Sequence, residues 1–292
     1  MTSHTITLPD GRLLGYALYG PPHGRPVLYF HGTPSSRLEL LLLHHYGKDL
    51  EALLLEAGLK LIAVDRPGMG LSTYDPHSNF LSFATDVGVL MDKLGITRTA
   101  VMGWSGGGPF TLALAYKFPD RISHACIICG FARPFDEEVV RAMNTNVWYF
   151  RAAKYIPLLL RSGMFVVSRN RVNHTLPQKV TGLPYEDFQY LKRLRDLRVL
   201  ARVTLKEACR FGTRGAVHEA RNYYKYFGFD LQQVQPPVHY WWGTKDKSVI
   251  ELHAMAVEQQ VPNARMHYRP GEGHLSIWVR YMKEVLQTAA SY

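Results

Sequence analysis

Ser105 lies in a sequence pattern that could make its hydroxyl a nucleophile. Gly103, Trp104, Ser105, Gly106 and Gly107 fit the pattern G-x-S-x-G. In such a segment a strand turns sharply into a helix, which requires small neighbours and leaves the serine oxygen exposed. A serine hydroxyl also needs a base to take its proton and a third group to hold that base. The pattern predicts acyl-transfer chemistry if a histidine and an acid join the serine.

The last part of the chain supplies a candidate acid and a candidate base. Asp246 follows the short apolar run 238–242, and His274 follows the run 265–268. Open parallel sheets gather functional side chains at the carboxyl ends of their strands, so residues after two such strands can meet. Glu272 is a competing acid, but only two residues from His274 it is poorly placed to reach that ring. We therefore predict a triad in the chain order serine, aspartate, histidine.

The elements that must position these residues alternate along both ends of the chain. A turn at Pro9, Asp10 and Gly11 predicts a β-hairpin over 6–19. Beyond it, apolar runs predict strands and helical patterns lie between them, which indicates a parallel sheet with right-handed crossovers. Strands are expected at 27–30, 59–64, 99–103, 125–129, 238–242 and 265–268, and helices at 38–57, 80–94, 109–116, 249–260 and 276–289.

The alternation stops after residue 129 and resumes near residue 238. Residues 135–227 are mostly helical in pattern and rich in aromatic and arginine side chains. We predict a catalytic core formed by 1–130 and 236–292, with a helical cap, 131–235, inserted into it. The cap has 18 Lys and Arg against 9 Asp and Glu, which is nine of the net +10 charge of the chain. Such a surface could attract anions or acidic lipids, or could simply be solvated.

With these pieces in order, the chain resembles the α/β-hydrolase fold family, serine hydrolase type, along nearly its whole length. The resemblance rests on five segments: 31–34 (HGTP), 65–72 (DRPGMGLS), the Ser105 turn, the Asp246 loop and 271–274 (GEGH). It implies an α/β fold with a mostly parallel doubly wound sheet. It also implies Ser105 as nucleophile, Asp246 as acid and His274 as base.

The resemblance further implies an oxyanion hole formed by the backbone N–H groups of Thr33 and Gly106. Members with an HGGP-like loop have glycine where Thr33 stands, so the threonine could narrow the pocket or add a hydroxyl donor. The proline that often follows the acid by a few residues is absent here, since 248–250 read Ser-Val-Ile. His31 is expected to support the loop and Asp65 to anchor the turn 66–70.

The remaining histidines and cysteines are expected to be packing or surface residues. Cys126 and Cys129 form C-x-x-C within a predicted strand, where residues three apart point to opposite faces and cannot readily chelate a metal. An odd number of cysteines also argues against a disulfide scaffold. No metal and no cofactor is predicted. The helical histidines in this group are His44, His45, His218 and His253.

A serine nucleophile favours an ester, lactone, thioester, amide or cleavable ketone as substrate. The cap has no acid between Arg141 and Tyr185, which favours a neutral or anionic acyl group over the free amine of an aminopeptidase substrate. We predict ester or lactone hydrolysis, with Trp104, Trp148 and Phe150 as candidate substrate contacts. The alternatives are a carbon-carbon bond hydrolase or aminopeptidase of the same fold, and a ligand-sensing receptor with slow hydrolysis.

Composition limits the partners and the location. A chain of 292 residues, 47% hydrophobic, can bury a large core. Arg151, Lys154 and Arg161 interrupt the most apolar stretch, so stable membrane insertion is not expected. No nucleic-acid motif accompanies the positive charge, and no export signal is visible at the start. We expect a cytoplasmic monomer or homodimer acting on a small acyl substrate.

Overall fold

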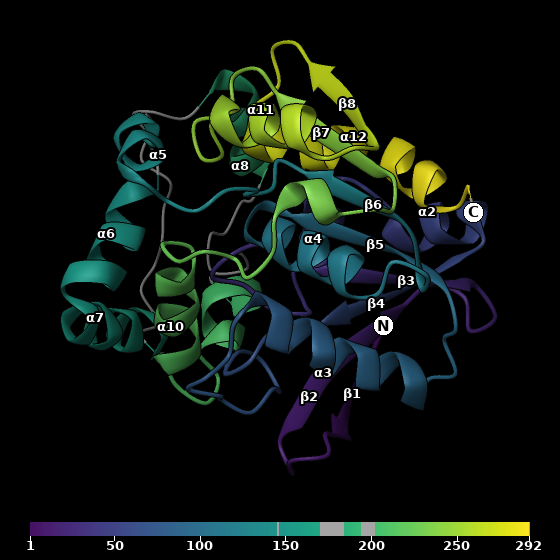
Figure 1. The fold of residues 1–292 in the computed structure, drawn as a ribbon, viewed down its shortest axis with the longest axis horizontal. Coiled ribbons are helices and arrows are strands. Elements are labelled where there is room, and N and C mark those ends of the chain that lie inside the picture. Colours follow the sequence, from purple (N-terminus) through teal and green to yellow (C-terminus); the bar gives the residue numbers. More distant parts are fainter. Residues whose placement is uncertain (145, 170–183, 194–201, 292) are drawn as a thin grey trace.

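The computed structural model describes residues 1–144, 146–169, 184–193 and 202–291. An eight-stranded sheet forms its centre, in the order β1-β2-β4-β3-β5-β6-β7-β8 (Figure 1). β2 runs antiparallel to both β1 and β4, and every other neighbouring pair is parallel. The strands are β1 (Thr2–Thr7), β2 (Leu13–Tyr19), β3 (Arg25–Phe30), β4 (Leu59–Val64), β5 (Thr99–Trp104), β6 (Ile122–Ile128), β7 (Val238–Gly243) and β8 (Ala264–Arg269).

The register brings the ends of the central strands to one edge of the sheet. Phe30 at the end of β3 pairs with Gly103 of β5, and Gly243 at the end of β7 pairs with Arg269 of β8. Parallel strands in register end together, so the loops that follow them share that edge. The predicted functional loops, which begin at residues 31, 105, 244 and 270, therefore meet there.

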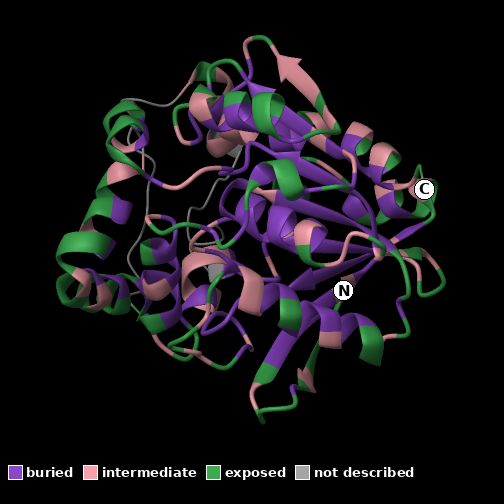
Figure 2. Ribbon diagram, in the orientation of Figure 1, coloured by how far each residue is buried: buried purple, intermediate pink, exposed green. Residues whose placement is uncertain are grey.

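Helices cover both faces of the sheet. α3 and α4 pack against each other on one face, and α2 and α12 on the other (Figure 1). Buried strand residues fill the space between these layers, so the strands form the purple centre of Figure 2. The helices of the core are α1 (Leu41–His45), α2 (Leu50–Ala57), α3 (Phe80–Lys93), α4 (Gly108–Lys117), α11 (Glu251–Gln260) and α12 (His274–Ala289).

Between β6 and β7 the described residues form helices and no strand. These are α5 (Glu137–Ala142), α6 (Val147–Tyr155), α7 (Pro157–Arg169), α8 (Tyr185–Arg193), a π-helical turn η2 (Arg202–Lys206), α10 (Arg214–Asn222) and a short 3-10 helix η3 (Leu231–Gln233). We call α5 to α10 the cap helices. α10 packs against α6 and α7, whereas α8 packs against α12 of the core.

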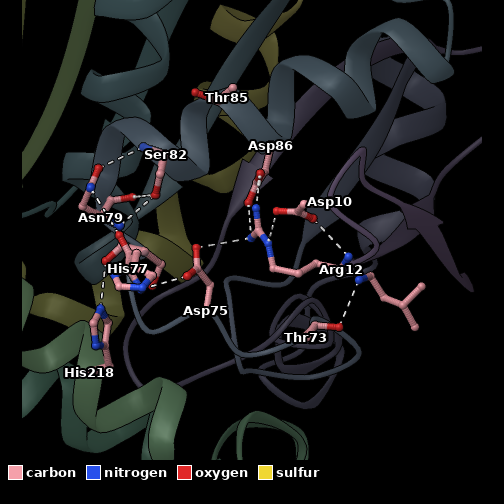
Figure 3. A network of polar contacts seen from close by, with 12 residues as sticks. Asp10, Arg12, Thr73, Asp75, His77, Asn79, Ser82, Thr85, Asp86 and His218 are labelled. Atoms are coloured by element: carbon pink, nitrogen blue, oxygen red, sulfur yellow. Dashed lines mark hydrogen bonds and ion pairs between the residues drawn. The ribbon is translucent and has the colours of Figure 1, made fainter.

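Polar contacts tie the N-terminal hairpin and the cap to the same part of the core (Figure 3). Arg12, in the hairpin turn, donates two hydrogen bonds to Asp86 of α3, at 2.8 and 2.9 Å. From the cap helix α10, His218 Nε2 lies 2.8 Å from the carbonyl oxygen of Ser78, which also accepts from Asn222. These bonds fix the approach of α10 to the loop before α3.

Most predicted elements are confirmed within one or two residues, but the single helix expected over 38–57 is wrong. The structure has two helices there, α1 and α2, separated by a turn in which Gly47 has a φ of 81°. Asp49 then caps α2, because its side chain accepts a hydrogen bond from the N–H of Ala52. The continuous apolar pattern hid this break, since both helices bury leucines on the same core.

Candidate active site

Ser105 occupies a tight turn between β5 and α4. Its φ is 54°, a left-handed value that is uncommon for residues other than glycine, and the residue is 7% exposed. A 3-10 turn, Ser105–Gly107, leads directly into α4, where Pro109 sits in the first turn. The left-handed backbone fits the sharp turn that the G-x-S-x-G pattern predicted, whereas the low exposure of Ser105 differs from the exposed serine oxygen that was expected.

His274 and Asp246 are joined by a short hydrogen bond. His274 Nδ1 lies 2.7 Å from Asp246 Oδ2, and the Asp246 side chain is fully buried. The other carboxylate oxygen accepts from the backbone N–H groups of Ser248 and Val249, at 2.7 and 2.9 Å. The Asp246 carboxylate is thus held in place by its own loop. Because it bonds to Nδ1 of His274, Nε2 is the ring nitrogen that can accept a proton from the serine.

The protonation of His274 reflects two opposing effects. Burial disfavours the charged imidazolium, but the nearby Asp246 carboxylate and its hydrogen bond outweigh burial, so the pKa of His274 is raised above its ordinary value. No hydrogen bond joins Ser105 Oγ to His274 in this structure, although both lie in the described part of the chain. Catalytic hydrogen bonds commonly tighten only when substrate binds.

Trp104, the residue before the serine, contacts the histidine ring. Its indole stacks on the imidazole of His274, with ring centroids 5.2 Å apart, and on the indole of Trp278, at 4.5 Å. Its Nε1 also donates to the carbonyl oxygen of His274 at 3.3 Å. Sequence analysis predicted a substrate contact for Trp104; in the structure its ring stacks on two aromatic residues of α12.

Thr33 and Gly106 lie against each other, as an oxyanion hole would require. A side chain at Gly106 would begin within 2.6 Å of the Thr33 side chain and within 2.7 Å of the Tyr223 hydroxyl, so only glycine fits there. Among the turn and loop hydrogen bonds of the described residues, none is donated by the backbone N–H of Thr33. Thr33 Oγ1 is buried and has no hydrogen-bond partner in the described residues.

A buried ion pair supports residues 31–34, the segment that contains Thr33, which we call the oxyanion loop after its proposed role. Arg66 donates to the carbonyl oxygens of His31 and Gly32, and its guanidinium pairs with Glu219 of the cap helix α10. Tyr223, one turn further along the chain, donates to the carbonyl oxygen of Gly106 at 2.8 Å. Sequence analysis missed all three residues, because no local pattern links position 66 to positions 219 and 223.

His31 and Glu39 also belong to this support. His31 Nδ1 lies 2.8 Å from the carbonyl oxygen of Gly32, and burial together with the Arg66 charge lowers its pKa well below the ordinary value. Glu39 accepts from the N–H of Gly32 and from the Tyr29 hydroxyl, and burial raises its pKa to about 7. A neutral, buried His31 matches the structural role expected for it.

Asp187 of the cap helix α8 caps the helix that begins with His274. Its carboxylate accepts from the backbone N–H groups of His274, Leu275 and Ser276, at 2.9, 3.0 and 2.8 Å (for Leu275 and Ser276 through the same oxygen). The N-terminus of a helix favours such an anion. Burial raises the pKa of Asp187, opposed by these backbone donors. A cap residue thus positions the candidate base.

The other two predicted substrate contacts lie in different surroundings. Trp148 is 65% exposed and lines a cavity of about 650 Å³ between α6, α7 and the oxyanion loop. Phe150 is 1% exposed and packs edge-on against Phe131 and Phe135. The cavity lining is largely apolar and includes Thr33, but neither Ser105 nor His274.

Cys129 lies beside the acid. Among the described residues, Cys129, Asp246 and His274 form the one group of three potential metal ligands, with ligand atoms within 4.8 Å of one another. Asp246 and His274 already bond to each other, and burial, followed by the Asp246 charge, raises the pKa of the Cys129 thiol well above its ordinary value. A protonated thiol is a poor metal ligand, and Cys126, Cys129 and Cys209 are all free and buried.

Comparison with known proteins identifies the family. A family model described as the alpha/beta hydrolase fold matches residues 25–281. The chain belongs to the α/β-hydrolase family. The fold class expected from sequence is thereby confirmed, and so is its assignment as a hydrolase enzyme.

Two relatives of this α/β hydrolase have names that state an activity. A Caulobacter sp. (strain K31) protein named putative carbamate hydrolase RutD is 24% identical over 84% of this chain and 87% of its own. A proline iminopeptidase of Xylella fastidiosa (strain 9a5c) is 31% identical, but over 40% of this chain and 36% of its own.

Solved structures share the fold over the full chain. An esterase from Thermogutta terrifontis has a TM-score of 0.69 at 20% identity, covering 99% of this chain and 96% of its own. An enol-lactonase from Burkholderia xenovorans LB400 has a TM-score of 0.65 at 20% identity, covering 98% and 97%. At 20% identity these likenesses establish the fold of the hydrolase but not its substrate, which has to be inferred from the site.

Proposed function

We propose that this α/β hydrolase cleaves carboxylic esters or lactones through an acyl-enzyme formed on Ser105. The observation that carries the proposal is the 2.7 Å bond between His274 and Asp246, in a chain that also holds Ser105 in a left-handed turn between strand and helix. A histidine oriented by a carboxylate, together with a serine in such a turn, is the combination that activates a serine hydroxyl. The raised pKa of His274 suits a residue that must hold a proton briefly.

The proposed reaction has two halves. Ser105 Oγ attacks the carbonyl carbon while His274 Nε2 takes its proton, and the carbonyl oxygen becomes an anion held by the N–H groups of Thr33 and Gly106. The intermediate then expels the alkoxide, which takes the proton from His274. In the second half a water molecule attacks the acyl-serine and gives a proton to His274. The intermediate then releases the carboxylic acid, and His274 returns the proton to Ser105 Oγ.

The proposed division of labour follows the two parts of the chain. Residues 1–130 and 236–292 supply the reacting groups, and residues 131–235 form a cap that closes over them. The apolar lining of the 650 Å³ cavity next to Thr33 favours an uncharged acyl or alkyl group there. Two cap carboxylates that reach the site, Asp187 and Glu219, are already engaged with α12 and Arg66, which disfavours binding of a free amine.

Carbamate cleavage is a second candidate, because a relative named putative carbamate hydrolase matches 84% of the chain. It would use the same nucleophile, base and oxyanion hole on a carbonyl that carries nitrogen. A panel of p-nitrophenyl esters, lactones, a carbamate and a proline arylamide separates these reactions from the aminopeptidase alternative.

Labelling with a fluorophosphonate tests the nucleophile. The wild-type protein should be labelled once, at Ser105, and Ser105→Ala should be unlabelled and lose about 10⁴-fold or more in turnover. Ser291→Ala, which changes an exposed serine near the C-terminus, is the matched control and should label normally. Labelling that survives Ser105→Ala would refute the assignment.

A further inference from the structure

Two cap helices leave an apolar surface exposed. α7 buries Leu160, Met164 and Ser168, which recur every four residues and so share one side of the helix. The rest of its surface remains open, as the green outer edge of α6 and α7 in Figure 2 shows. Large apolar side chains there are 48% to 72% exposed. We call them the apolar cap face: Tyr155, Ile156, Leu158, Leu159, Phe165 and Val166.

Clustering distinguishes this face from the rest of the surface. Exposed apolar residues on the core, such as Leu55 on α2, occur singly. Single exposed apolar residues are normal, whereas contiguous patches mark interaction sites. The apolar cap face has six exposed apolar residues within twelve positions of one helical pair, which is the pattern of an interaction site.

The two helices of this face carry basic side chains and no acidic ones. Arg151, Lys154, Arg161 and Arg169 lie on the same two helices, and the sequence has no Asp or Glu between Arg141 and Tyr185. None of these four forms an ion pair with the described residues. Lys154 instead lies over the rings of Tyr155 and Tyr224, and Arg169 over that of Phe165. Apolar side chains between cations are the chemistry of a helix on an anionic lipid surface.

An apolar cavity connects this face to the oxyanion loop. The 650 Å³ cavity is lined on the cap side by Ile156 and Leu159 of the apolar cap face, and on the core side by Thr33 and Pro34. Its exposed lining is predominantly apolar. A lipid-soluble group that enters from the face would therefore reach Thr33, at the proposed oxyanion hole, along an apolar lining.

We propose that the apolar cap face docks on the surface of anionic phospholipid bilayers, so that lipid-soluble acyl substrates enter the cavity directly. No helix in the described residues is long and apolar enough to cross a membrane, so docking would be peripheral. Docking depends only on the surface of α6 and α7, whereas substrate delivery rests on the proposed function. The two ideas can therefore fail separately.

Vesicle flotation with the full chain tests docking. The probes are vesicles of phosphatidylcholine alone and of phosphatidylcholine with phosphatidylserine, at low and high salt. Wild type and Ser105→Ala should both bind the anionic vesicles, more weakly as salt rises. The double variant Leu158→Ser/Val166→Ser should lose binding by roughly tenfold or more. Leu55→Ser, equally exposed on the core, is its matched control and should bind like wild type.

A second pair of variants tests the contribution of the basic side chains to vesicle binding. Arg151→Gln/Lys154→Gln should weaken binding to anionic vesicles by roughly tenfold or more, while Lys93→Gln/Lys117→Gln on the core should not. In thermal melting and in hydrolysis of a short water-soluble ester, Leu158→Ser/Val166→Ser should match wild type, which would show that the variant is folded and active.

Three results would overturn the proposal. The first is no flotation of wild type with either vesicle, and the second is equal binding of Leu158→Ser/Val166→Ser and wild type. The third is a dimer in sedimentation velocity that Leu158→Ser/Val166→Ser dissociates, since the face would then cover a second copy of the chain. If docking succeeds while fluorophosphonate labelling fails, the surface stands and the proposed chemistry falls.

Discussion

The core and the cap contribute to the candidate site in different ways. Core loops carry the groups proposed to react, Ser105, Asp246 and His274, at the ends of β5, β7 and β8. Cap helices carry groups that hold those loops in place. Asp187 caps the helix of His274, and Tyr223 bonds to the carbonyl of Gly106. The comparison teaches that the cap helices are part of the framework that positions the candidate site.

The strongest test on the core side is Asp246→Asn. The neutral amide cannot raise the pKa of His274, so the pKa should fall and the proton should bind the wrong nitrogen. We expect kcat to drop by about 10³ to 10⁴-fold, which is typical when the triad aspartate of a serine protease is replaced by asparagine. Rates on a soluble ester measure it, and a fall of less than tenfold would remove Asp246 from the triad.

The pH profile gives the sign of this effect. His274 must be neutral to accept the Ser105 proton, so wild-type kcat/KM should decline as pH falls through the raised pKa of His274, above its ordinary value of 6.5. In Asp246→Asn the remaining activity should persist to lower pH. If kcat/KM declined at the same low pH in Asp246→Asn as in wild type, the coupling between Asp246 and His274 would be contradicted.

On the cap side the largest effect should come from Glu219→Gln. This change leaves the Arg66 charge buried without its counter-ion, which typically costs about 3–5 kcal/mol in the free energy of unfolding. Urea unfolding measures it. Glu137→Gln breaks the exposed pair with Arg141 and should change stability little. Equal effects of the two variants would mean that the buried pair does not anchor the cap.

Asp187→Asn should have a smaller effect that is visible in kcat and in the pH profile. The variant keeps one acceptor for the N-terminus of α12 but removes a charge that helps raise the pKa of His274. We expect kcat/KM to fall roughly tenfold or less, with an acid limb shifted to lower pH. Asp136→Asn, at the N-cap of α5, is the matched control. A purely structural role would lower stability and leave the limb unmoved.

Thr33→Val should give the smallest change. The variant keeps the backbone N–H but removes a buried hydroxyl that has no partner among the described residues. If that hydroxyl donates to the oxyanion, kcat should fall roughly two- to tenfold while KM changes little. Unchanged turnover would restrict the role of Thr33 to its backbone.

Much of this site could be predicted because strand ends in a parallel sheet share one edge. Once apolar runs identified β5, β7 and β8, the residues after them were expected along one edge of the sheet. The bond between Asp246 and His274, which follow the adjacent strands β7 and β8, agrees with that expectation. The helix predicted over 38–57 was wrong because burial on a common core gives two short helices one continuous pattern. The stacking of Trp104 on His274 and Trp278 could not be predicted either, because those residues are distant from it along the chain.

By itself the sequence determined the α/β-hydrolase fold, the turn at Ser105 and the order of the candidate triad. These depend on periodicity and on residues that are near in sequence or fixed by strand order. Only the tertiary structure decided that Asp187, Glu219 and Tyr223 support the site from the cap. Side chains at such separations meet through the packing of whole helices, and no local pattern of residues encodes that packing.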